Sequence, residues 1–357
     1  MFFKTKLALL SDYIIGWIIA LSLLQFVRTY GIPAYHPVET SLLQQILMVL
    51  GFGSLGGLLF GFIQIRFERY YDQRLSIGKL FLISVVVQTV AIILLSVLIY
   101  LMYVYLLDME DVTFVEFVKE PSFTVFFLYV ILVNMVLTIL RQINLLLGPG
   151  NLMKFVRGEF YHPYEEVRIF MFLDLRSSTT IAERLGHVRY SQFIQDCFRD
   201  LAVVTRFKAS IYQYVGDEAV LTWQQNEGLE NHNCLRAFFQ FEERLRQKAD
   251  EYQKKYGEVP VFRAGMNVGT VTVAEVGVVK REIAFHGDTV NTAARIQEKC
   301  NELNKKLLIS EFLQEKLNGT PGFNREKIGT MRLRGRQETI ALFAVERAVR
   351  HSNPSYP

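Results

Sequence analysis

Four long apolar stretches in the first 147 residues constrain the fold of this chain more than any other feature. They run over roughly 7–27, 42–65, 80–107 and 122–147. Each reaches the roughly 20 residues that an α-helix needs to cross the apolar core of a bilayer. One such stretch alone would fit a buried core helix, but four in succession favour a membrane domain. No small-residue cleavage site follows the first stretch, which is therefore interpreted as a span and not as a signal peptide.

Basic residues indicate which side of the membrane each connection occupies. They precede the first span and lie between the second and third, at Lys4, Lys6, Arg66, Arg69, Arg74 and Lys79. The connection between the third and fourth spans is acidic. Because Lys and Arg collect in cytoplasmic loops, both termini are predicted to be cytoplasmic. The sequence thus predicts a multi-pass protein of the cell (inner) membrane whose polar half lies in the cytosol.

Few polar features mark the spans themselves. Asp12 lies within the first span near its cytoplasmic end, either as a functional carboxylate or as an interfacial charge. No span contains a histidine, so haem is not expected. The second span carries Gly53, Gly57 and Gly61, a spacing that suits close helix packing within or between chains.

Composition changes sharply after the fourth span. Gly148, Pro149 and Gly150 break the last apolar helix. We therefore predict a four-helix transmembrane domain over 1–147, a linker over 148–166, a second domain over 167–346 and a tail over 347–357. The net charge of the whole chain is +4, which favours no nucleic-acid partner. Its three cysteines have no metal-like spacing and are expected to be reduced thiols: Cys197, Cys234 and Cys300.

Strand and helix patterns mix in the second domain, which predicts an α+β fold. The expected strands are 167–173, a hairpin over 210–223, 261–268 and 270–276, and the expected helices are 181–207, 231–256 and 289–304. The hairpin turns at Gly216 and Asp217, and the first strand ends at Asp174. A hairpin tip beside a strand end brings both carboxylates to one edge of a sheet.

Three short motifs carry the chemistry of this domain. Asp174 ends an apolar run and opens into Leu175-Arg176-Ser177-Ser178-Thr179. Asp217 follows Gly216 in the hairpin, and Asn291 and Arg295 lie four residues apart on the last predicted helix. Each motif alone also fits a structural role, namely a helix cap, a turn pair or a surface helix residue. All three motifs in this order indicate a site that holds metal ions and binds a phosphate group.

These motifs resemble the catalytic domain of the class III nucleotidyl cyclases, the fold shared by adenylate and guanylate cyclases, of the membrane-anchored bacterial type. The matching stretches are 172–179, 216–218 and 287–295, with a weaker match at 333–336. The resemblance implies a ferredoxin-like or palm-type sheet with helices. It also implies that a nucleoside triphosphate is converted to its 3′,5′-cyclic monophosphate and pyrophosphate.

The resemblance assigns a role to each matching residue. Asp174 and Asp217 would hold two divalent cations, Mg²⁺ or Mn²⁺, which prefer carboxylate and phosphate oxygens. Asn291 would orient the ribose, and Arg295 would stabilise charge on the α-phosphate. The phosphate-binding residues would be Leu175, Arg176, Ser177 and Ser178 through their backbone N–H groups, and Arg334 and Arg336 through their side chains.

In this family the metal carboxylates and the Asn-Arg pair of one site come from different subunits. Because this chain carries both sets, the resemblance implies a homodimer with two composite active sites. The membrane half and the linker would then set how the two catalytic domains meet.

The positions that read the base depart from the family pattern. Gln213 stands where adenine-selective members usually carry Lys, and Ala284 stands where they carry Asp or Thr. ATP is the expected substrate, with GTP or a pyrimidine nucleotide as alternatives because Gln both donates and accepts hydrogen bonds. The same departure leaves a catalytically silent, cyclase-like membrane receptor or scaffold as the competing hypothesis.

Overall fold

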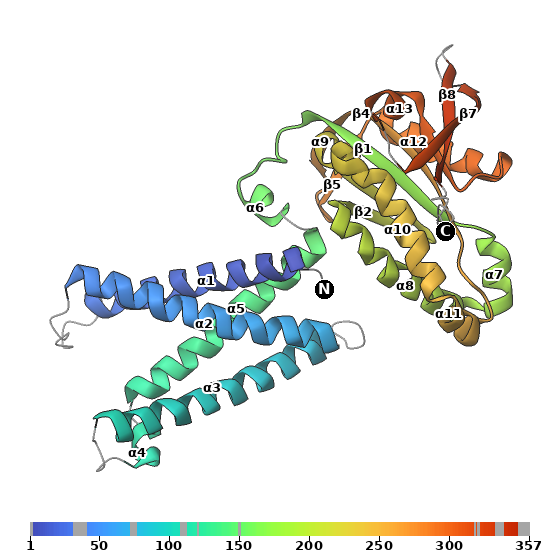
Figure 1. Ribbon diagram of the computed structural model, residues 1–357. Coiled ribbons are helices and arrows are strands. Elements are labelled where there is room, and N and C mark those ends of the chain that lie inside the picture. Colours follow the sequence, from blue (N-terminus) through green and yellow to red (C-terminus); the bar gives the residue numbers. More distant parts are fainter. Residues whose placement is uncertain are drawn as a thin grey trace, which may run out of the picture. The chain divides into compact units, whose positions relative to one another are not determined.

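The computed structural model describes residues 3–30, 41–71, 77–107, 113–119, 121–148, 151–317, 319, 322–332 and 339–348. The chain divides into two compact units, Met1–Leu146 and Leu147–Pro357 (Figure 1). Each unit is described below by itself.

The first unit is helical. Its elements are α1 (Phe3–Tyr30), α2 (Leu42–Tyr71), α3 (Ile77–Leu107), α4 (Phe114–Lys119) and α5 (Pro121–Leu147). Three segments are long and apolar enough to cross a membrane, judged by length and composition: Lys6–Val27, Leu42–Glu68 and Thr124–Leu147. The third predicted span, 80–107, falls on α3, where the described residues give a shorter apolar segment, Val85–Leu94.

Glycines of α2 allow α1 to approach it closely. A Cβ added at Gly57 would lie 2.4 Å from the Cα of Ile14, and one at Gly53 would lie 3.0 Å from the Cα of Ile18. These contacts are with backbone atoms, which cannot move aside as a side chain can. The small-residue spacing on the second span therefore serves packing within one chain.

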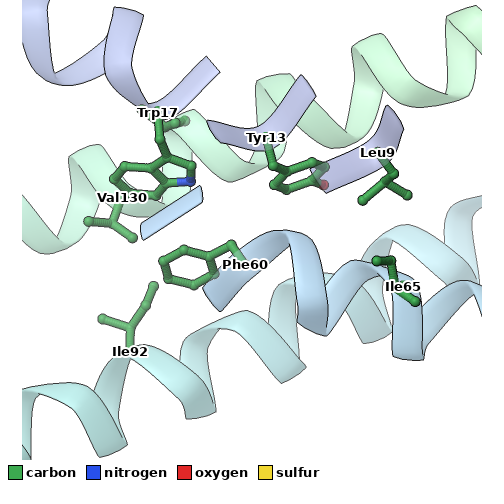
Figure 2. Packing of buried hydrophobic residues seen from close by; sticks show 8 residues of the cluster. Leu9, Tyr13, Trp17, Phe60, Ile65, Ile92 and Val130 are labelled. Atoms are coloured by element: carbon green, nitrogen blue, oxygen red, sulfur yellow. The ribbon is translucent and has the colours of Figure 1, made fainter. Parts of the chain in front are cut away.

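A buried cluster fills the space between the helices of this unit (Figure 2). Trp17 of α1 stacks on Phe60 of α2 with ring centroids 5.3 Å apart. The same cluster contains Leu9, Tyr13, Ile65, Ile92 and Val130, which Figure 2 labels, and Val133. Toward the end of α2, Arg141 of α5 donates two hydrogen bonds to Glu68, at 3.0 and 3.3 Å. Asp12 is exposed on α1.

The second unit is built on a mixed sheet of eight strands. Their bounds are β1 (Tyr164–Leu175), β2 (Ser210–Val215), β3 (Glu218–Gln224), β4 (Phe262–Val276), β5 (Glu282–His286), β6 (Leu307–Ser310), β7 (Phe323–Arg332) and β8 (Thr339–Arg347). The strand order is β2-β3-β1-β4-β6-β8-β7, and β5 pairs with β4. β1 is antiparallel to both β3 and β4, and six consecutive residues of it are buried, so both of its faces are covered, which explains its continuous apolar run. The α+β prediction is confirmed.

Helices connect and cover these strands. They are α6 (Asn151–Val156), α7 (Ser178–Leu185), α8 (His187–Leu201), α9 (Gln225–Leu229), α10 (Asn233–Gln247), α11 (Ala249–Tyr256), α12 (Asp288–Glu302) and α13 (Glu311–Lys316), with short 3₁₀ turns at Ala202–Phe207 and Glu230–His232. The prediction of one helix over 181–207 is wrong, because Gly186 takes a left-handed φ of 72° between α7 and α8. The helix predicted over 231–256 is likewise divided, at Lys248.

The two strands predicted on either side of Gly269 form one continuous strand, β4. Gly269 is required there for another reason: a Cβ at this position would lie 2.5 Å from Oγ1 of Thr289 on α12. This glycine marks a close helix contact and does not end the strand.

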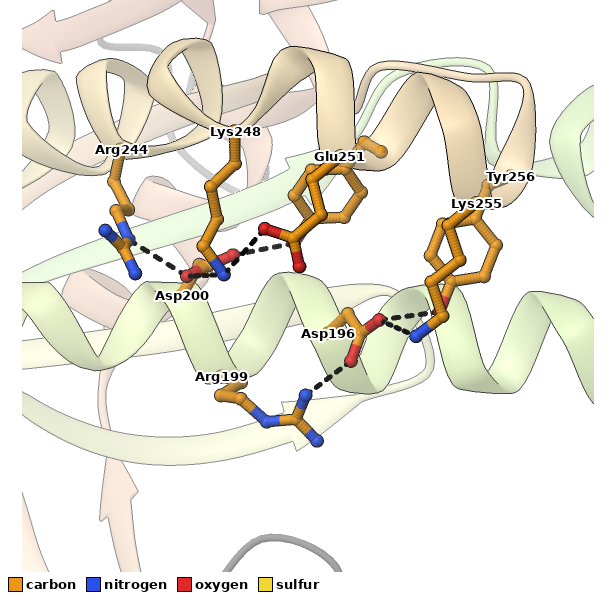
Figure 3. A network of polar contacts seen from close by, with 9 residues as sticks. Asp196, Arg199, Asp200, Arg244, Lys248, Glu251, Lys255 and Tyr256 are labelled. Atoms are coloured by element: carbon orange, nitrogen blue, oxygen red, sulfur yellow. Dashed lines mark hydrogen bonds and ion pairs between the residues drawn. The ribbon is translucent and has the colours of Figure 1, made fainter. Parts of the chain in front are cut away.

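A polar network joins α8 to α10 and α11 (Figure 3). Asp200 of α8 accepts hydrogen bonds from Arg244 at 3.0 Å and from the Tyr252 hydroxyl at 3.0 Å. One turn earlier, Asp196 accepts hydrogen bonds from Lys255 and Tyr256. Because each carboxylate has several partners, the network fixes these helices against each other. The three cysteines are free thiols, in agreement with the prediction, and all are buried: Cys197, Cys234 and Cys300.

The predicted linker packs onto the second unit. Phe160, which follows α6, is 3% exposed and belongs to a cluster with Phe170 and Val273 of the sheet. Its carbonyl oxygen accepts a hydrogen bond from the Glu275 amide at 3.0 Å. The C-terminal end of the predicted linker is therefore anchored to the folded domain through Phe160.

Candidate active site

Two carboxylates meet at one edge of the sheet. Asp174 is the penultimate residue of β1, and Asp217 lies in the two-residue turn between β2 and β3. Gly216 takes a left-handed φ of 62°, which glycine adopts without penalty and which makes this tight turn possible. Because Leu173 pairs with Ala219, Asp174 lies level with Glu218, next to Asp217. The sequence prediction that a hairpin tip and a strand end bring these groups together is confirmed.

The proximity of these carboxylates changes their proton affinity. Burial, and then the negative charge of Asp217, raise the pKa of Asp174 to about 6. Burial and the charges of Asp174 and Asp217 raise the pKa of Glu218 to about 7. Because the ionised carboxylates are unfavourable next to each other, a bound cation would stabilise this site.

Asp174 and Asp217 suit divalent cations that leave part of their coordination sphere open for a substrate. Among the described residues, no three His, Cys, Asp or Glu side chains converge into a complete metal site. Mg²⁺ and Mn²⁺ are often held by one or two carboxylates together with substrate phosphates and water. Asp174 and Asp217 supply two hard oxygen ligands of this kind.

The turn after β1 offers backbone donors beside the carboxylates. Ser177 caps α7 with a left-handed φ of 59°, so the chain reverses here and begins a helix. The Arg176 amide donates to the Val261 carbonyl at 2.9 Å and is occupied. The Ser177 and Ser178 amides stand at the helix start, where N–H groups lack partners within the helix. Of the predicted phosphate-binding segment, these two amides remain suited to an anion.

Asn291 and Arg295 lie on α12, which packs against β4. Gly265 makes this approach possible, because a Cβ there would lie 2.1 Å from the Gln297 backbone nitrogen. Asn291 is exposed and Arg295 partly exposed. Within the described part of one chain, no hydrogen bond or ion pair joins either residue to Asp174 or Asp217. The structure of one chain thus assembles the carboxylates but not the whole predicted site.

Gln297 was not among the predicted site residues. Its Nε2 donates to Oδ2 of Asp174 at 3.3 Å, although 123 residues separate the two. Its place beside Ile296 and Cys300 on the predicted helix indicates burial but not the contact with Asp174.

The predicted base-reading residues lie on β2 and β5. Gln213 is exposed opposite Val220, and Ala284 pairs with Ala274. Their immediate neighbours meet: the Phe285 amide donates to the Tyr212 hydroxyl at 3.4 Å, and the two rings lie 4.9 Å apart. The sequence did not indicate this aromatic contact, because it depends on where β5 folds. Arg334 and Arg336 lie outside the described residues.

Comparisons with known proteins agree on one family. The family model for the adenylate and guanylate cyclase catalytic domain matches residues 160–346. Adenylate cyclase 2 of Rhizobium meliloti (strain 1021) is 37% identical over 205 residues, which cover 57% of this chain and 56% of that protein. An adenylate cyclase of Anabaena cylindrica is 24% identical over 184 residues, which cover 49% of this chain and 36% of that protein. The chain thus spans about half the length of the first relative and about a third of the second.

A solved structure shares the fold. A bacterial light-regulated adenylyl cyclase aligns with a TM-score of 0.54 and 16% identity, covering 64% of this chain and 67% of that one. The strand order, the paired carboxylates and the matching family model lead to one conclusion: the chain belongs to the family of adenylate and guanylate cyclase catalytic domains.

Proposed function

We propose that this chain is a membrane-anchored adenylate cyclase that converts ATP to 3′,5′-cyclic AMP and pyrophosphate. The observation that carries the proposal is the convergence of Asp174 and Asp217 at one sheet edge. The relatives named as adenylate cyclases support ATP as the substrate.

Each residue of the site has a part in the proposed reaction. The oxygen of the ribose 3′-hydroxyl attacks the α-phosphorus, its proton is released and pyrophosphate leaves. Two Mg²⁺ or Mn²⁺ ions, when bound by Asp174 and Asp217, lower the pKa of that hydroxyl and neutralise the leaving pyrophosphate. Arg295 stabilises the charge that develops on the α-phosphate, and Asn291 orients the ribose.

The triphosphate is held by groups around this centre. The amides of Ser177 and Ser178 bind phosphate oxygens at the start of α7. Arg334 and Arg336 complete the phosphate site, since a guanidinium makes two parallel hydrogen bonds to a phosphate. Gln213 and Ala284 contact the base. Because Ala284 has no polar side-chain atom, base selection rests on Gln213 and on the shape of the pocket.

The active unit in this proposal is a homodimer. Asn291 and Arg295 face outward on α12, which suits delivery to the carboxylates of a second copy. A two-fold axis then creates two composite sites. The apolar helices hold both copies in the bilayer, with the termini and the catalytic domains in the cytosol.

The test is product formation by the purified full-length protein. It is incubated with Mn²⁺ and, in separate samples, ATP, GTP, CTP or UTP, and the products are identified by mass spectrometry. Asp174→Ala serves as the inactive control. Cyclic AMP that is absent in the control supports the proposal, whereas another cyclic nucleotide changes the base preference. No cyclic product from folded dimer overturns the enzyme proposal in favour of a silent receptor.

A further inference from the structure

Gln297 is the residue of α12 that contacts the metal carboxylate of its own chain. Its side chain is buried, with 5% of its surface exposed. Its Nε2 donates to Oδ2 of Asp174 at 3.3 Å. The contact joins the inward face of a helix to the end of the central strand. A buried donor at this distance restricts rotation of the carboxylate.

The helix that carries Gln297 is fixed to the sheet. Gly265 and Gly269 of β4 leave room for the α12 backbone and for Thr289. Asn267 Nδ2 donates to the Thr289 carbonyl at 3.1 Å, and Thr289 Oγ1 donates to the Thr270 carbonyl at 2.8 Å. One side-chain hydrogen bond is too weak to displace a helix held in this way. In this pair, therefore, the helix positions the carboxylate.

α12 presents different residues on its two faces. Asn291 and Arg295 lie on the outward face, and Gln297 lies about 200° around the helix from Arg295. In the proposed dimer, the same helix would serve two sites, its own carboxylates on one side and the partner's on the other.

We propose that Gln297 is a positioning residue that holds Asp174 of its own chain in the orientation that binds a divalent cation. The identity of that cation site rests on the proposed function. A neutral amide suits this role, since it donates a hydrogen bond without adding charge next to two carboxylates. The effect is expected to stay within one chain, because Gln297 contacts the carboxylate of its own chain and α12 is bonded to its own sheet.

The direct test measures metal binding without nucleotide. Full-length Gln297→Met keeps the side-chain length but cannot donate, and Gln247→Met, an exposed change on α10, is the matched control. Mn²⁺ binding followed by electron paramagnetic resonance is expected to weaken about tenfold in Gln297→Met, as is typical when a residue supporting a metal ligand is lost. The control should bind as the wild type does. Thermal melting of the metal-free proteins verifies folding, and Gln297→Asn, whose amide is one methylene too short, provides a second variant.

A dimer with one intact site tests whether the effect stays within the chain. One protomer carries Asp217→Ala and its partner does not, so only the partner's carboxylates remain functional. Gln297→Met in the protomer with intact carboxylates should raise the Mn²⁺ concentration for half-maximal activity about tenfold. The same change in the other protomer, which supplies Asn291 and Arg295, should leave that concentration unchanged. Unaltered Mn²⁺ binding, or an equal effect from either protomer, overturns the proposal.

The outcomes separate this inference from the proposed function. Wild-type protein that binds Mn²⁺ but forms no cyclic nucleotide refutes the proposed function, and weaker binding in Gln297→Met would still support the role of Gln297. Active wild-type protein whose Mn²⁺ affinity is unaffected by Gln297→Met refutes the inference alone.

Discussion

Asp174 and Asp217 lie next to each other at the edge of the sheet, and the negative charge of Asp217 adds to burial in raising the pKa of Asp174. A proton bound by Asp174 removes one of these two neighbouring negative charges. A bound cation takes the place of that proton. Metal binding and proton binding at this edge are therefore competing events, and the competition can be measured.

Stabilisation by Mn²⁺ should increase with pH. The pKa of Asp174 rises from 3.8 to about 6 on folding, so the metal-free protein loses stability as pH rises through that interval. Bound Mn²⁺ neutralises the Asp174 carboxylate and so removes this loss of stability. Asp174 is ionised and ready to bind Mn²⁺ only above a pH of about 6. The increase in melting temperature caused by Mn²⁺ should thus be small at about pH 5 and large at about pH 7.5. Asp174→Asn should abolish the difference, and an equal Mn²⁺ effect at both pH values would contradict the prediction.

Two inactive variants should restore each other's activity. Asp217→Ala removes a metal ligand, and Arg295→Ala removes the phosphate-directed cation. If sites form between protomers, a mixed dimer holds one intact site and one doubly defective site. Equal mixing is expected to give about a quarter of wild-type activity, because about half of the dimers are mixed and each has one working site.

The control for this experiment is the double variant in one chain. Asp217→Ala/Arg295→Ala mixed with wild-type protein leaves no intact site in the mixed dimer. Failure of the two single variants to complement, in dimers shown by tagged co-purification to be mixed, would indicate sites made within one chain.

Phe160 should be essential for the stability of the second unit. It is 3% exposed and packs among side chains of the sheet. Phe160→Ala is expected to lower the free energy of unfolding by about 3 kcal/mol, through lost burial and a residual cavity. Tyr161, at 77% exposure, is the matched control, and its replacement by Ala should cost less than about 0.5 kcal/mol. Chemical denaturation followed by Trp223 fluorescence measures both, and equal effects would show that the linker packing is unimportant.

Much of the catalytic domain could be predicted from its sequence because local patterns determine it. The apolar run of β1 and the glycine turn before Asp217 sufficed to place both carboxylates at one edge. The break at Gly186 follows from its own left-handed φ, whereas Gly269 stands in a continuous strand because Thr289 approaches it closely. A single glycine in the sequence does not reveal which of these two roles it has. Gln297 and the Tyr212–Phe285 contact also escaped prediction. Each becomes apparent only when α12 and β5 are placed against distant strands.

The ion pair between Glu68 and Arg141 should behave as a unit. The two side chains are 7% and 12% exposed, and two hydrogen bonds join them. Arg141→Met leaves a buried carboxylate without its partner and should destabilise the helical unit by about 3 kcal/mol. Adding Glu68→Gln removes the unpaired charge and should recover most of that loss. A double-mutant cycle on thermal stability in detergent gives the coupling energy between the two residues. Additive effects of the two substitutions would contradict the prediction.

Two glycines of α2 should respond in opposite ways to the same substitution. Gly57→Ala places a Cβ 2.4 Å from the Cα of Ile14 and should destabilise the α1–α2 pair by about 2 kcal/mol. No atom lies within 4 Å of a Cβ at Gly51, so Gly51→Ala should be neutral or stabilising by helix propensity. Thermal stability of the full chain measures both, and similar values would argue against the close contact.

Within one chain, α1 covers Gly53, Gly57 and Gly61 of α2. In the proposed membrane-bound dimer, these three glycines are therefore not available to the contact between the two helical units. Such a contact would use other side chains, with helix axes about 8–10 Å apart, and would leave the two copies freer to turn against each other than a glycine-lined contact would.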